Sequence, residues 1–367
     1  MHTIVVGAGI VGLSAAYALR KRQVDVTLVE RGAIPYHLAS SSDHHRLIRS
    51  LYGEDAGYCA RMGDAYAAWH AMWRDLRQPS ERYFADTGTL AVCREPGDYT
   101  DLSRETMERL GLPFERIDDP GEIAKRFPFV EVDGIAYAVM SDGGALRADR
   151  VMIDLVEWLR ENGTAVREHS PVASVDVFAG RVTLASGEIL EADRVLVCAG
   201  VETAKLVPDV SVPLAPVRSI IAYVEPPADI QQAWTNAPCW ADLGGDTILW
   251  GMPAIEGLPM KLGNGALGST DPDDSNRTVT PAEAQALLNG YVGHFKGADR
   301  FRILWAQANY WTLAPRSTFF LEQIDRVLVV SACSGHGFKF GALTGQDMAD
   351  AITGKDSVET IAARLAG

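Results

Sequence analysis

The first thirty residues contain a glycine-rich turn whose spacing could bind a pyrophosphate. The GxGxxG pattern at positions 7–12 consists of Gly7, Ala8, Gly9, Ile10, Val11 and Gly12. Gly7 permits a tight turn, Gly9 lets backbone N–H groups approach a phosphate, and Gly12 lets a helix pack closely on a strand. Glu30 ends the next apolar run and can accept hydrogen bonds from ribose hydroxyls. The pattern predicts a dinucleotide site and disfavours NADP, whose 2′-phosphate would meet a carboxylate, but it does not separate FAD from NAD.

Two arginines have a spacing that could bind an anion. Arg46 and Arg49 stand three residues apart with apolar residues between them, and on a helical turn both would point to one side. Arginine is suited to bidentate recognition of a carboxylate. A solvated basic face explains the same spacing, so the two interpretations stay open.

Two lysines occupy places of comparable interest. Lys339 stands between Phe338 and Phe340, an unusual setting for a charge, although a surface lysine with a buried stem would also fit. Lys261 stands in a region that reads as strands, where a strand-edge lysine would fit.

Metal and disulfide chemistry find little support. The chain has five scattered cysteines (Cys59, Cys93, Cys198, Cys239 and Cys333), an odd number with no CxxC pair. His44 and His45 would face opposite ways in an extended segment, and no third ligand is in view. We therefore expect reduced thiols in a cytoplasmic protein and no metal site.

The elements that must position these groups follow from apolar periodicity. Buried strands are predicted at 3–6 and 24–29, with a helix between them after the glycine turn. Further helices are predicted at 59–76, 149–162 and 282–290, and one that ends at Gly354. In the second of these, Asp149 is the expected N-cap. Strands are predicted at 88–92, 194–198 and 326–331.

Length and composition define the broad class. The 367 residues suggest about two domains, and 47% hydrophobic with 22% charged residues is typical of a soluble globular protein. A net charge of −14 argues against nucleic acid or an anionic membrane as partner.

The order of the expected elements predicts an α/β (α+β) fold with two intertwined domains. We expect a Rossmann-like dinucleotide-binding domain built from three segments, 1–80, 145–214 and 322–367. Residues 81–144 and 215–321 would form an inserted antiparallel-sheet substrate domain.

Along nearly its whole length the sequence resembles the D-amino acid oxidase-like FAD enzymes, in particular the branch of monomeric sarcosine oxidase and N-methyltryptophan oxidase. The specific stretches are Arg46-Leu47-Ile48-Arg49 with Tyr52-Gly53-Glu54, and Ser334-Gly335-His336-Gly337-Phe338-Lys339-Phe340. Less specific ones are the glycine turn, Thr87-Gly88, Asn162-Gly163, Pro213 to Arg218, and Lys261-Leu262-Gly263. Members of this family bind FAD and oxidise the C–N bond of amines or amino acids, usually with O₂ as acceptor.

The resemblance implies roles for individual residues. Arg49 and Lys339 would hold a substrate carboxylate, Arg46 would lie near the flavin, and Lys261 would assist the reduction of O₂. Trp250 and Tyr310, with Trp311, would surround the substrate. Contacts to FAD would come from Gly7, Gly9, Ile10, Val11, Gly12, Glu30, Arg31, Arg46, Val172, Gly200, Gly335, Gly337, Phe338 and Lys339.

Two departures from the branch refine these expectations. The stretch that matches the flavin-linking cysteine of sarcosine oxidases, residues 306–310, contains no cysteine, so we expect non-covalent FAD. Gly265 stands where those enzymes carry a histidine, which puts sarcosine in doubt and leaves space near the ring.

Together these observations predict an FAD-dependent oxidase of a carboxylate-bearing primary, secondary or cyclic amine. Its partners would be that small amine and O₂, and the sequence does not fix the oligomeric state, with which a monomer is compatible. The main alternative is a flavin dehydrogenase that passes electrons to another acceptor. A nucleotide-binding protein without redox turnover and a nicotinamide enzyme are further alternatives.

Overall fold

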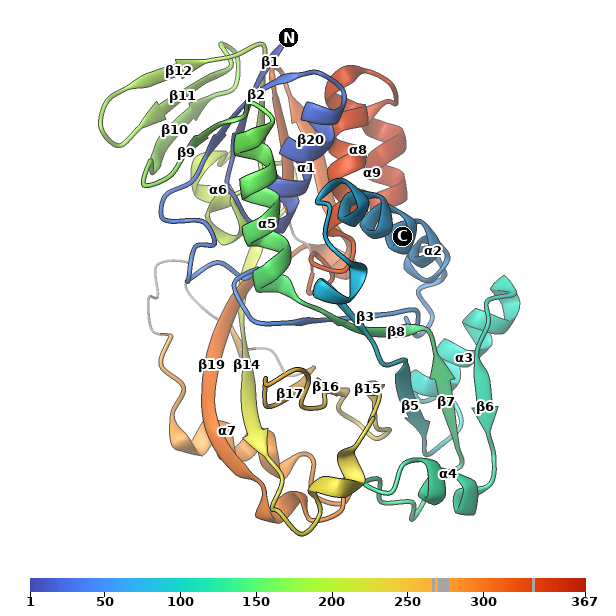
Figure 1. The fold of residues 1–367 in the computed structure, drawn as a ribbon. Coiled ribbons are helices and arrows are strands. Elements are labelled where there is room, and N and C mark those ends of the chain that lie inside the picture. The colour runs from blue at the N-terminus through green and yellow to red at the C-terminus, as the bar shows by residue number, and fades with distance from the viewer. Residues whose placement is uncertain (266–267, 270–276, 332–333) are drawn as a thin grey trace.

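The computed structural model describes residues 1–265, 268–269, 277–331 and 334–367. Figure 1 shows two parts, each built on its own large sheet, with the chain passing between them several times. Cys333 lies outside the described residues. Within the described ranges, no helix has the length and apolar character of a membrane span.

The upper part in Figure 1 is built on a six-stranded sheet. Its order is β20 (Phe320–Ile324), β21 (Val327–Ser331), β13 (Arg194–Val197), β1 (His2–Val6), β2 (Asp25–Val29) and β9 (Ala165–Arg167). The five strands from β21 to β9 all run parallel to one another. The edge strand β20 is antiparallel to β21. Because the chain leaves β1 for β2 on one side and β13 lies on the other, the carboxyl end of β1 is a switch point where ligands bind in such sheets.

Helices cover this sheet and bury its β-branched strands. The helices α1 (Ile10–Lys21) and α8 (Gly341–Thr353) pack against each other unusually closely. A Cβ added at Gly345 would lie 2.4 Å from the backbone carbon of Ser14, and one at Gly341 2.6 Å from Ile10. The other helices around this part are α2 (Ala56–Asp75), α5 (Ala148–Glu161), α6 (Thr203–Leu206) and α9 (Val358–Leu365).

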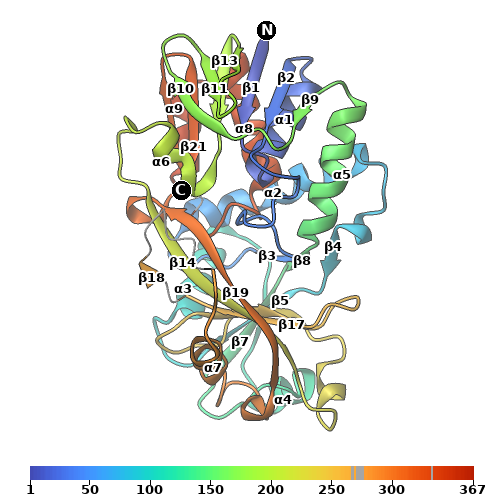
Figure 2. The same cartoon turned by 90° about the vertical axis from the view of Figure 1, so that its left-hand side faces the viewer.

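The lower part is built on a nine-stranded sheet. Its strands are β5 (Thr89–Cys93), β6 (Glu115–Ile117), β7 (Tyr137–Ser141), β14 (Ala215–Glu225), β15 (Cys239–Asp242), β16 (Leu249–Met252), β17 (Met260–Asn264), β18 (Gly268–Ser269) and β19 (Arg302–Leu313). The described pairs are antiparallel except β5 with β15, so the sheet is mixed rather than purely antiparallel. Figure 2 shows the long pair β14–β19 running from the upper part into the lower one.

Two small sheets complete the described strands. One contains β10 (Val172–Asp176), β11 (Arg181–Leu184) and β12 (Ile189–Glu191), and the other contains β3 (Arg46–Arg49), β8 (Gly143–Leu146) and β4 (Phe84–Asp86). The second of these joins the two parts of the molecule in Figure 1. It also carries the two arginines of interest.

The structure confirms the expected helices and strands with small shifts at their ends, and it corrects three points. The N-cap of α5 is Arg147 and makes no side-chain hydrogen bond, so the expectation for Asp149 is wrong. Residues 46–49 form a strand rather than a helical turn. The sequence analysis did not predict α3 (Tyr99–Leu110) or α4 (Pro120–Arg126), whereas it did predict α7 (Pro281–Asn289).

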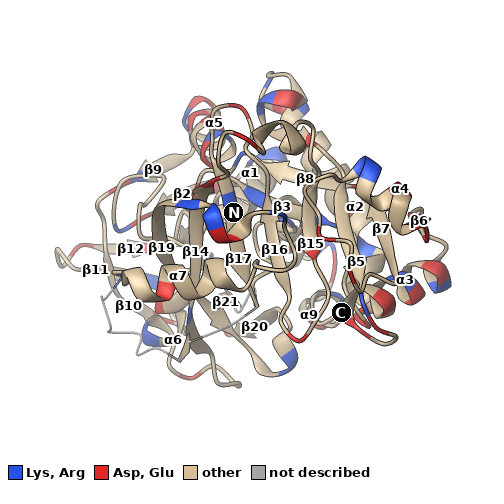
Figure 3. Cartoon of the chain, turned by 90° about the horizontal axis from the view of Figure 1, so that it is seen from below, with Lys and Arg blue, Asp and Glu red and all other residues tan. Residues whose placement is uncertain are grey.

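Charged residues are interspersed along the elements. Figure 3 shows basic and acidic positions mixed on the same helices and loops in the view from below. This mixing accords with a protein of net charge −14 that has many surface ion pairs.

Candidate active site

The glycine turn follows β1 and approaches neighbouring backbone too closely for other residues. Gly7 has φ +100°, donates its N–H to the Val29 carbonyl at 2.9 Å, and would place a Cβ 2.6 Å from the Cys198 carbonyl oxygen. A Cβ at Gly12 would lie 1.9 Å from the Gly7 carbonyl oxygen. Only glycine fits at these two positions without moving the backbone.

The amino end of α1 presents its positive end beside this turn. Its N-cap, Gly9, provides no side-chain hydrogen bond, and its first turn contains no acidic residue. The Ile10 N–H donates to the Ser41 hydroxyl at 3.0 Å, and the half-buried Val11 packs against the core. Such a helix end favours a negatively charged group.

Glu30 closes the other side of the turn. Its side chain is 7% exposed and accepts hydrogen bonds from the Ala8 N–H at 2.8 Å and the Gly32 N–H at 3.3 Å. Arg31 points elsewhere, to an ion pair with Glu202 at 3.2 Å. The acid therefore fixes the loop in which a ribose would lie.

The remaining residues expected to contact the cofactor lie at the ends of other elements. Val172 begins β10 and packs on the core behind β1, and Gly200, with φ +58°, follows β13. In the segment before α8, Gly335 is exposed and Gly337 is buried, while Phe338 stacks on Trp69 at 5.9 Å between ring centroids.

Three side chains surround the buried Lys261; we call Asp43, Arg46, Tyr223 and Lys261 the lysine–aspartate cluster. The Lys261 ammonium contacts the Asp43 carboxylate and donates to the His45 carbonyl at 2.9 Å. Arg46 contacts the same carboxylate, and the Tyr223 hydroxyl donates to it at 2.5 Å. The side chains of Asp43 and Lys261 are each 1% exposed.

Burial and charge together set the ionisation of this cluster. Although burial acts in the opposite direction, the Lys261 ammonium and the Arg46 guanidinium hold the pKa of the Asp43 carboxyl well below its usual range. Burial lowers the pKa of Lys261 to about 8, against the opposing effect of the Asp43 carboxylate. Burial lowers the pKa of His45 to about 3, so its ring is neutral, and both of its nitrogens lack a partner in the described part of the chain.

A second cationic group lies on the other side of β3; we call Arg49, Tyr52, Tyr99, His336 and Lys339 the tyrosine-lined cluster. The Arg49 guanidinium lies 4.8 Å from the Tyr52 ring centroid and 5.5 Å from that of Tyr99. The Lys339 ammonium lies 5.4 Å from the centroid of the same Tyr52 ring. Lys339 as a whole residue is 7% exposed. Both cations therefore flank one aromatic ring.

Arg49 has no counter-ion among the residues that the structure describes. It forms no ion pair with any Asp or Glu that the structure describes, and its Nη1 atom is buried without a hydrogen-bond partner there. Burial, with Lys339 and Arg49 adding to it, lowers the pKa of His336 well below its usual value. The cluster thus combines two cations with a neutral histidine.

The strand geometry of residues 46–49 separates the two arginines. A helical turn would have placed Arg46 and Arg49 on one side, but β3 pairs with β8 so that Arg46 faces Leu146 and Arg49 faces Gly143. Side chains three residues apart in a strand point to opposite faces. Arg46 accordingly joins Lys261, and Arg49 joins Lys339.

The aromatic residues expected near a substrate are distributed around these clusters. Trp250 lies beside Lys261, with its ring centroid 5.8 Å from the ammonium. The ring centroid of Tyr310 lies 4.7 Å from the guanidinium carbon of Arg277. The Tyr310 backbone carbonyl accepts a hydrogen bond from the Ser40 hydroxyl. A Cβ on Gly335 would lie 3.6 Å from the Trp311 ring, so Trp311 neighbours the segment before α8. The structure thus brings Trp250 beside a predicted catalytic lysine.

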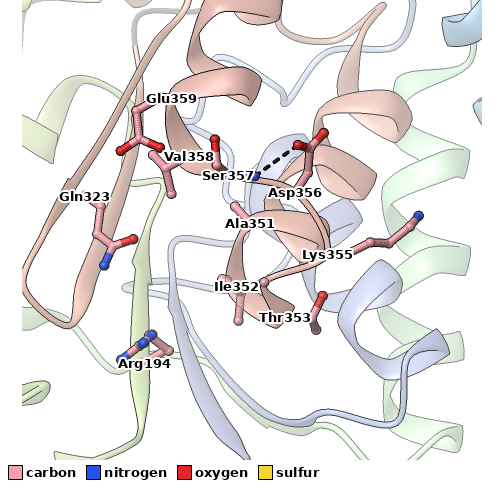
Figure 4. A pocket seen from close by; sticks show the side chains of 11 residues that line it. Arg194, Gln323, Ala351, Ile352, Thr353, Lys355, Asp356, Ser357, Val358 and Glu359 are labelled. Carbon is pink, nitrogen blue, oxygen red and sulfur yellow. Dashed lines mark hydrogen bonds between the residues drawn. The ribbon is translucent and has the colours of Figure 1, made fainter.

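A pocket of about 580 Å³ opens at the opposite end of the six-stranded sheet (Figure 4). It lies where β13 begins, at Arg194, and where α8 ends, near Lys355 and Asp356. The glycine turn follows the other end of these parallel strands. None of the predicted site residues lines this pocket.

Comparison with known proteins identifies the family. Residues 2–351 match the sequence profile described as FAD dependent oxidoreductase. The chain belongs to this family. The FAD enzyme predicted by the sequence resemblance is therefore confirmed, and the protein is an FAD-dependent oxidoreductase.

Similar characterised proteins agree with the predicted branch. The chain is 26% identical to monomeric sarcosine oxidase of Bacillus sp. (strain NS-129), over 96% of this chain and 93% of that protein. It is 24% identical to N-methyl-L-tryptophan oxidase of Yersinia pestis (strain Pestoides F), over 94% and 92%. Among solved structures, L-proline dehydrogenase from P. horikoshii shares the fold with a TM-score of 0.82 at 18% identity, over 97% of this chain and 94% of that one.

The residues present fit FAD. A pyrophosphate needs a backbone cradle, which Gly7 and Gly12 provide at distances that exclude a Cβ, and a helix end without a side-chain cap, which Gly9 provides. Ser41 and Asp43 link this cradle to Lys261 through a short loop. These residues would hold the nucleotide half of FAD.

Sequence reasoning missed Asp43. Nothing local identifies its partner Lys261, because that residue is 218 positions away in the chain. The one local signal was an acid three residues before Arg46, a spacing that the ion pair in the structure uses.

Proposed function

We propose that this enzyme oxidises the C–N bond of an amine that carries a carboxylate. The observation that carries the proposal is the guanidinium of Arg49, which has a buried nitrogen without a partner and no counter-ion among the described acids. The Lys339 ammonium lies beside the same Tyr52 ring as the Arg49 guanidinium. A carboxylate bound there would supply the missing acceptor, and Arg is the residue best suited to bind it in a bidentate manner.

The reaction removes two electrons and two protons from a CH–NH unit and leaves a C=N bond. Bound FAD supplies the two-electron redox chemistry. Arg49 and Lys339 would fix the carboxylate and thereby orient the adjacent carbon, which raises the rate through positioning. The amine must react as the free base, because its nitrogen lone pair forms the C=N bond. Burial holds the pKa of His336 well below its usual value, so this neutral ring does not supply a proton to that nitrogen. The imine product is then hydrolysed by water or released.

The proposed electron acceptor is O₂, which gains the two electrons and two protons and becomes H₂O₂. Lys261 provides a buried cation, and a fixed cation stabilises the negative charge that develops on O₂. If the acceptor were instead a quinone or a protein, the enzyme would be a dehydrogenase of the same family. The acceptor does not alter the proposed role of Arg49.

The substrate class is expected to be bulkier than sarcosine. Among the residues that the structure describes, a Cβ on Gly265 would meet Ile248 at 3.5 Å as its nearest atom, an ordinary van der Waals contact, so a small side chain would fit there. Trp250 adds a half-buried aromatic face near Lys261. These features favour cyclic or aromatic secondary amino acids, with primary amino acids also in the class.

The test is anaerobic mixing of the purified yellow protein with N-methyl, cyclic and primary amino acids while the visible absorbance of FAD is recorded. We expect at least one carboxylate-bearing amine to bleach the flavin, and admission of air to restore the colour with formation of H₂O₂. Bleaching only by amines that lack a carboxylate would overturn the proposal. Bleaching that air does not reverse, but a quinone does, would identify the dehydrogenase.

A matched pair of variants connects the test to Arg49. Arg49→Gln should bleach far more slowly at low substrate concentration. Arg126→Gln removes an arginine that pairs with Glu115 on the surface of the lower part, and it should behave as wild type.

A further inference from the structure

We propose that Asp43 is the positioning residue that keeps the buried Lys261 side chain ionised and directed, so that the enzyme retains a fixed cation for its electron acceptor. The inference rests on the proposed role of Lys261 and extends it to a residue outside the glycine turn and the carboxylate-binding group. It predicts that replacing Asp43 removes the positive charge that Lys261 offers to the electron acceptor, although Lys261 itself is still present.

The contacts of Asp43 are those of a preorganised counter-ion. One carboxylate oxygen contacts the Lys261 ammonium and the Arg46 guanidinium. The other accepts from the Tyr223 hydroxyl at 2.5 Å and the His44 N–H at 2.8 Å. Since both oxygens are fixed by donors from separate elements, the carboxylate cannot move away from the lysine without breaking several hydrogen bonds.

Lys261 depends on this carboxylate for its charge. The charged and titratable side chains around the lysine and its neighbour are Asp43, Arg46, His45, Arg147 and Tyr223. Asp43 is the acid among them, Arg46 is a like charge, and His45 is neutral. A lysine without a compensating carboxylate in such a site loses its proton near or below neutral pH. The His45 carbonyl alone would not offset that loss.

A purely structural role is the competing explanation. Asp43 also links the segment after Ser41 to β14 through Tyr223, so its loss could loosen this loop. That explanation predicts weaker FAD binding or lower thermal stability. It does not predict a change in the charge of Lys261, and the two explanations therefore differ in a measurable quantity.

The experiment compares FAD-loaded wild type with Asp43→Asn, Asp43→Ser, Lys261→Met and Asp149→Asn. The serine variant provides a second test should the asparagine variant fold poorly. Asp149→Asn is the matched control, because Asp149 pairs with the neighbouring His44 at 3.7 Å and not with Lys261. It removes the same charge from the same region.

The first readout is the ionisation of Lys261 itself. The chain has seven lysines, so ¹³Cε-labelled lysine gives a small set of NMR signals, and the signal absent from Lys261→Met identifies Lys261. We expect an ammonium at pH 7 in wild type and in Asp149→Asn. In the Asp43 variants we expect a neutral amine, with a pKa below about 7. A Lys261 signal that still reports an ammonium at pH 7 in both Asp43 variants would overturn the proposal.

The second readout is the rate at which dithionite-reduced enzyme reacts with O₂, which needs no amine substrate. Asp43→Asn should be slower than wild type at pH 7 by about tenfold or more and should recover as the pH is lowered. Lys261→Met should be slow at every pH. If Lys261→Met reacts as fast as wild type, the proposed role of the lysine fails. If only the Asp43 variants react normally, the role of Asp43 alone fails.

Discussion

Replacement of Arg49 by glutamine is expected to remove carboxylate recognition without harming the fold. In the free protein Arg49 has no counter-ion among the described acids, and the desolvation of its buried Nη1 atom is not compensated by a hydrogen bond. Removing such a charge does not cost stability and can increase it. We therefore expect the melting temperature of Arg49→Gln to equal or exceed that of wild type.

The size of the functional effect follows from the same contacts. A hydrogen bond to a charged group contributes about 1.5–3 kcal/mol, and truncating one partner of a buried charge pair costs about 2–5 kcal/mol. Arg49 is partly exposed, so the lower part of this range applies. About 2–3 kcal/mol corresponds to a loss of roughly 30–150-fold in affinity for the substrate.

The assay is a double-mutant-type cycle in which the protein side chain and the substrate carboxylate are each altered alone and then together. The reductive half-reaction is measured by stopped flow for wild type, Arg49→Gln and Lys339→Met, with the carboxylate substrate and with its primary amide. Wild type should prefer the carboxylate strongly, whereas Arg49→Gln should lose most of that preference. The coupling between the two changes isolates the guanidinium–carboxylate interaction from general damage to the site.

One result would refute this reasoning. If Arg49→Gln lowers the rate equally with the carboxylate and the amide, Arg49 does not bind the carboxylate. The same conclusion would follow if Lys339→Met alone abolished the preference. Arg126→Gln, which changes a distant surface pair, should keep the preference of wild type.

Further predictions concern the cofactor and pH. Gly12→Ala should weaken FAD binding by about tenfold or more, because its Cβ would lie 1.9 Å from a carbonyl oxygen and overpacking costs ~1–3 kcal/mol; Gly63→Ala, in open space, should bind FAD normally in the same fluorescence titration. Acid precipitation should release all flavin into the supernatant, since residues 306–310 contain no cysteine; a yellow pellet would contradict this. His45 is neutral in the fold down to about pH 3, whereas the unfolded chain protonates it below about 6.5. Denaturant titrations should therefore show the free energy of unfolding falling below pH 6.5 by up to ~1.4 kcal/mol per pH unit, and His45→Gln should reduce that slope.

The sequence predicts those parts of the fold that local patterns determine. The first strand, the glycine turn and α1 were identified because an apolar β-branched run, spaced glycines and an acid leave few alternatives. The helix α8 ends at Gly354, with φ +69°, as its C-terminal glycine indicated. These signals lie within about one element of the residues they describe.

Residues 46–49 show where local reasoning fails. Two arginines three apart are compatible with a helix or a strand, and nothing nearby decides between them. The strand conformation is determined by pairing with β8, which lies almost 100 positions later in the chain. Gly143 and Gly144 of β8 let β3 and β4 approach on both sides. A Cβ at Gly144 would lie 2.1 Å from the Ala85 carbonyl oxygen. A long-range strand pairing thus determined which face each arginine occupies.

The separation of the arginines also assigns the two cationic groups different tasks. Arg46 and Lys261 share the Asp43 carboxylate, which occupies the position that an incoming anion would need. Arg49, on the other face of β3, has no such acid among the described residues. We therefore infer that an anionic substrate would bind at Arg49, where no described acid competes, and that the lysine–aspartate cluster would serve a small uncharged acceptor. Removing the negative charge in Asp43→Asn should consequently change which cluster an anion such as benzoate prefers. The shift would appear as a change in how strongly benzoate inhibits reduction of the flavin by the substrate.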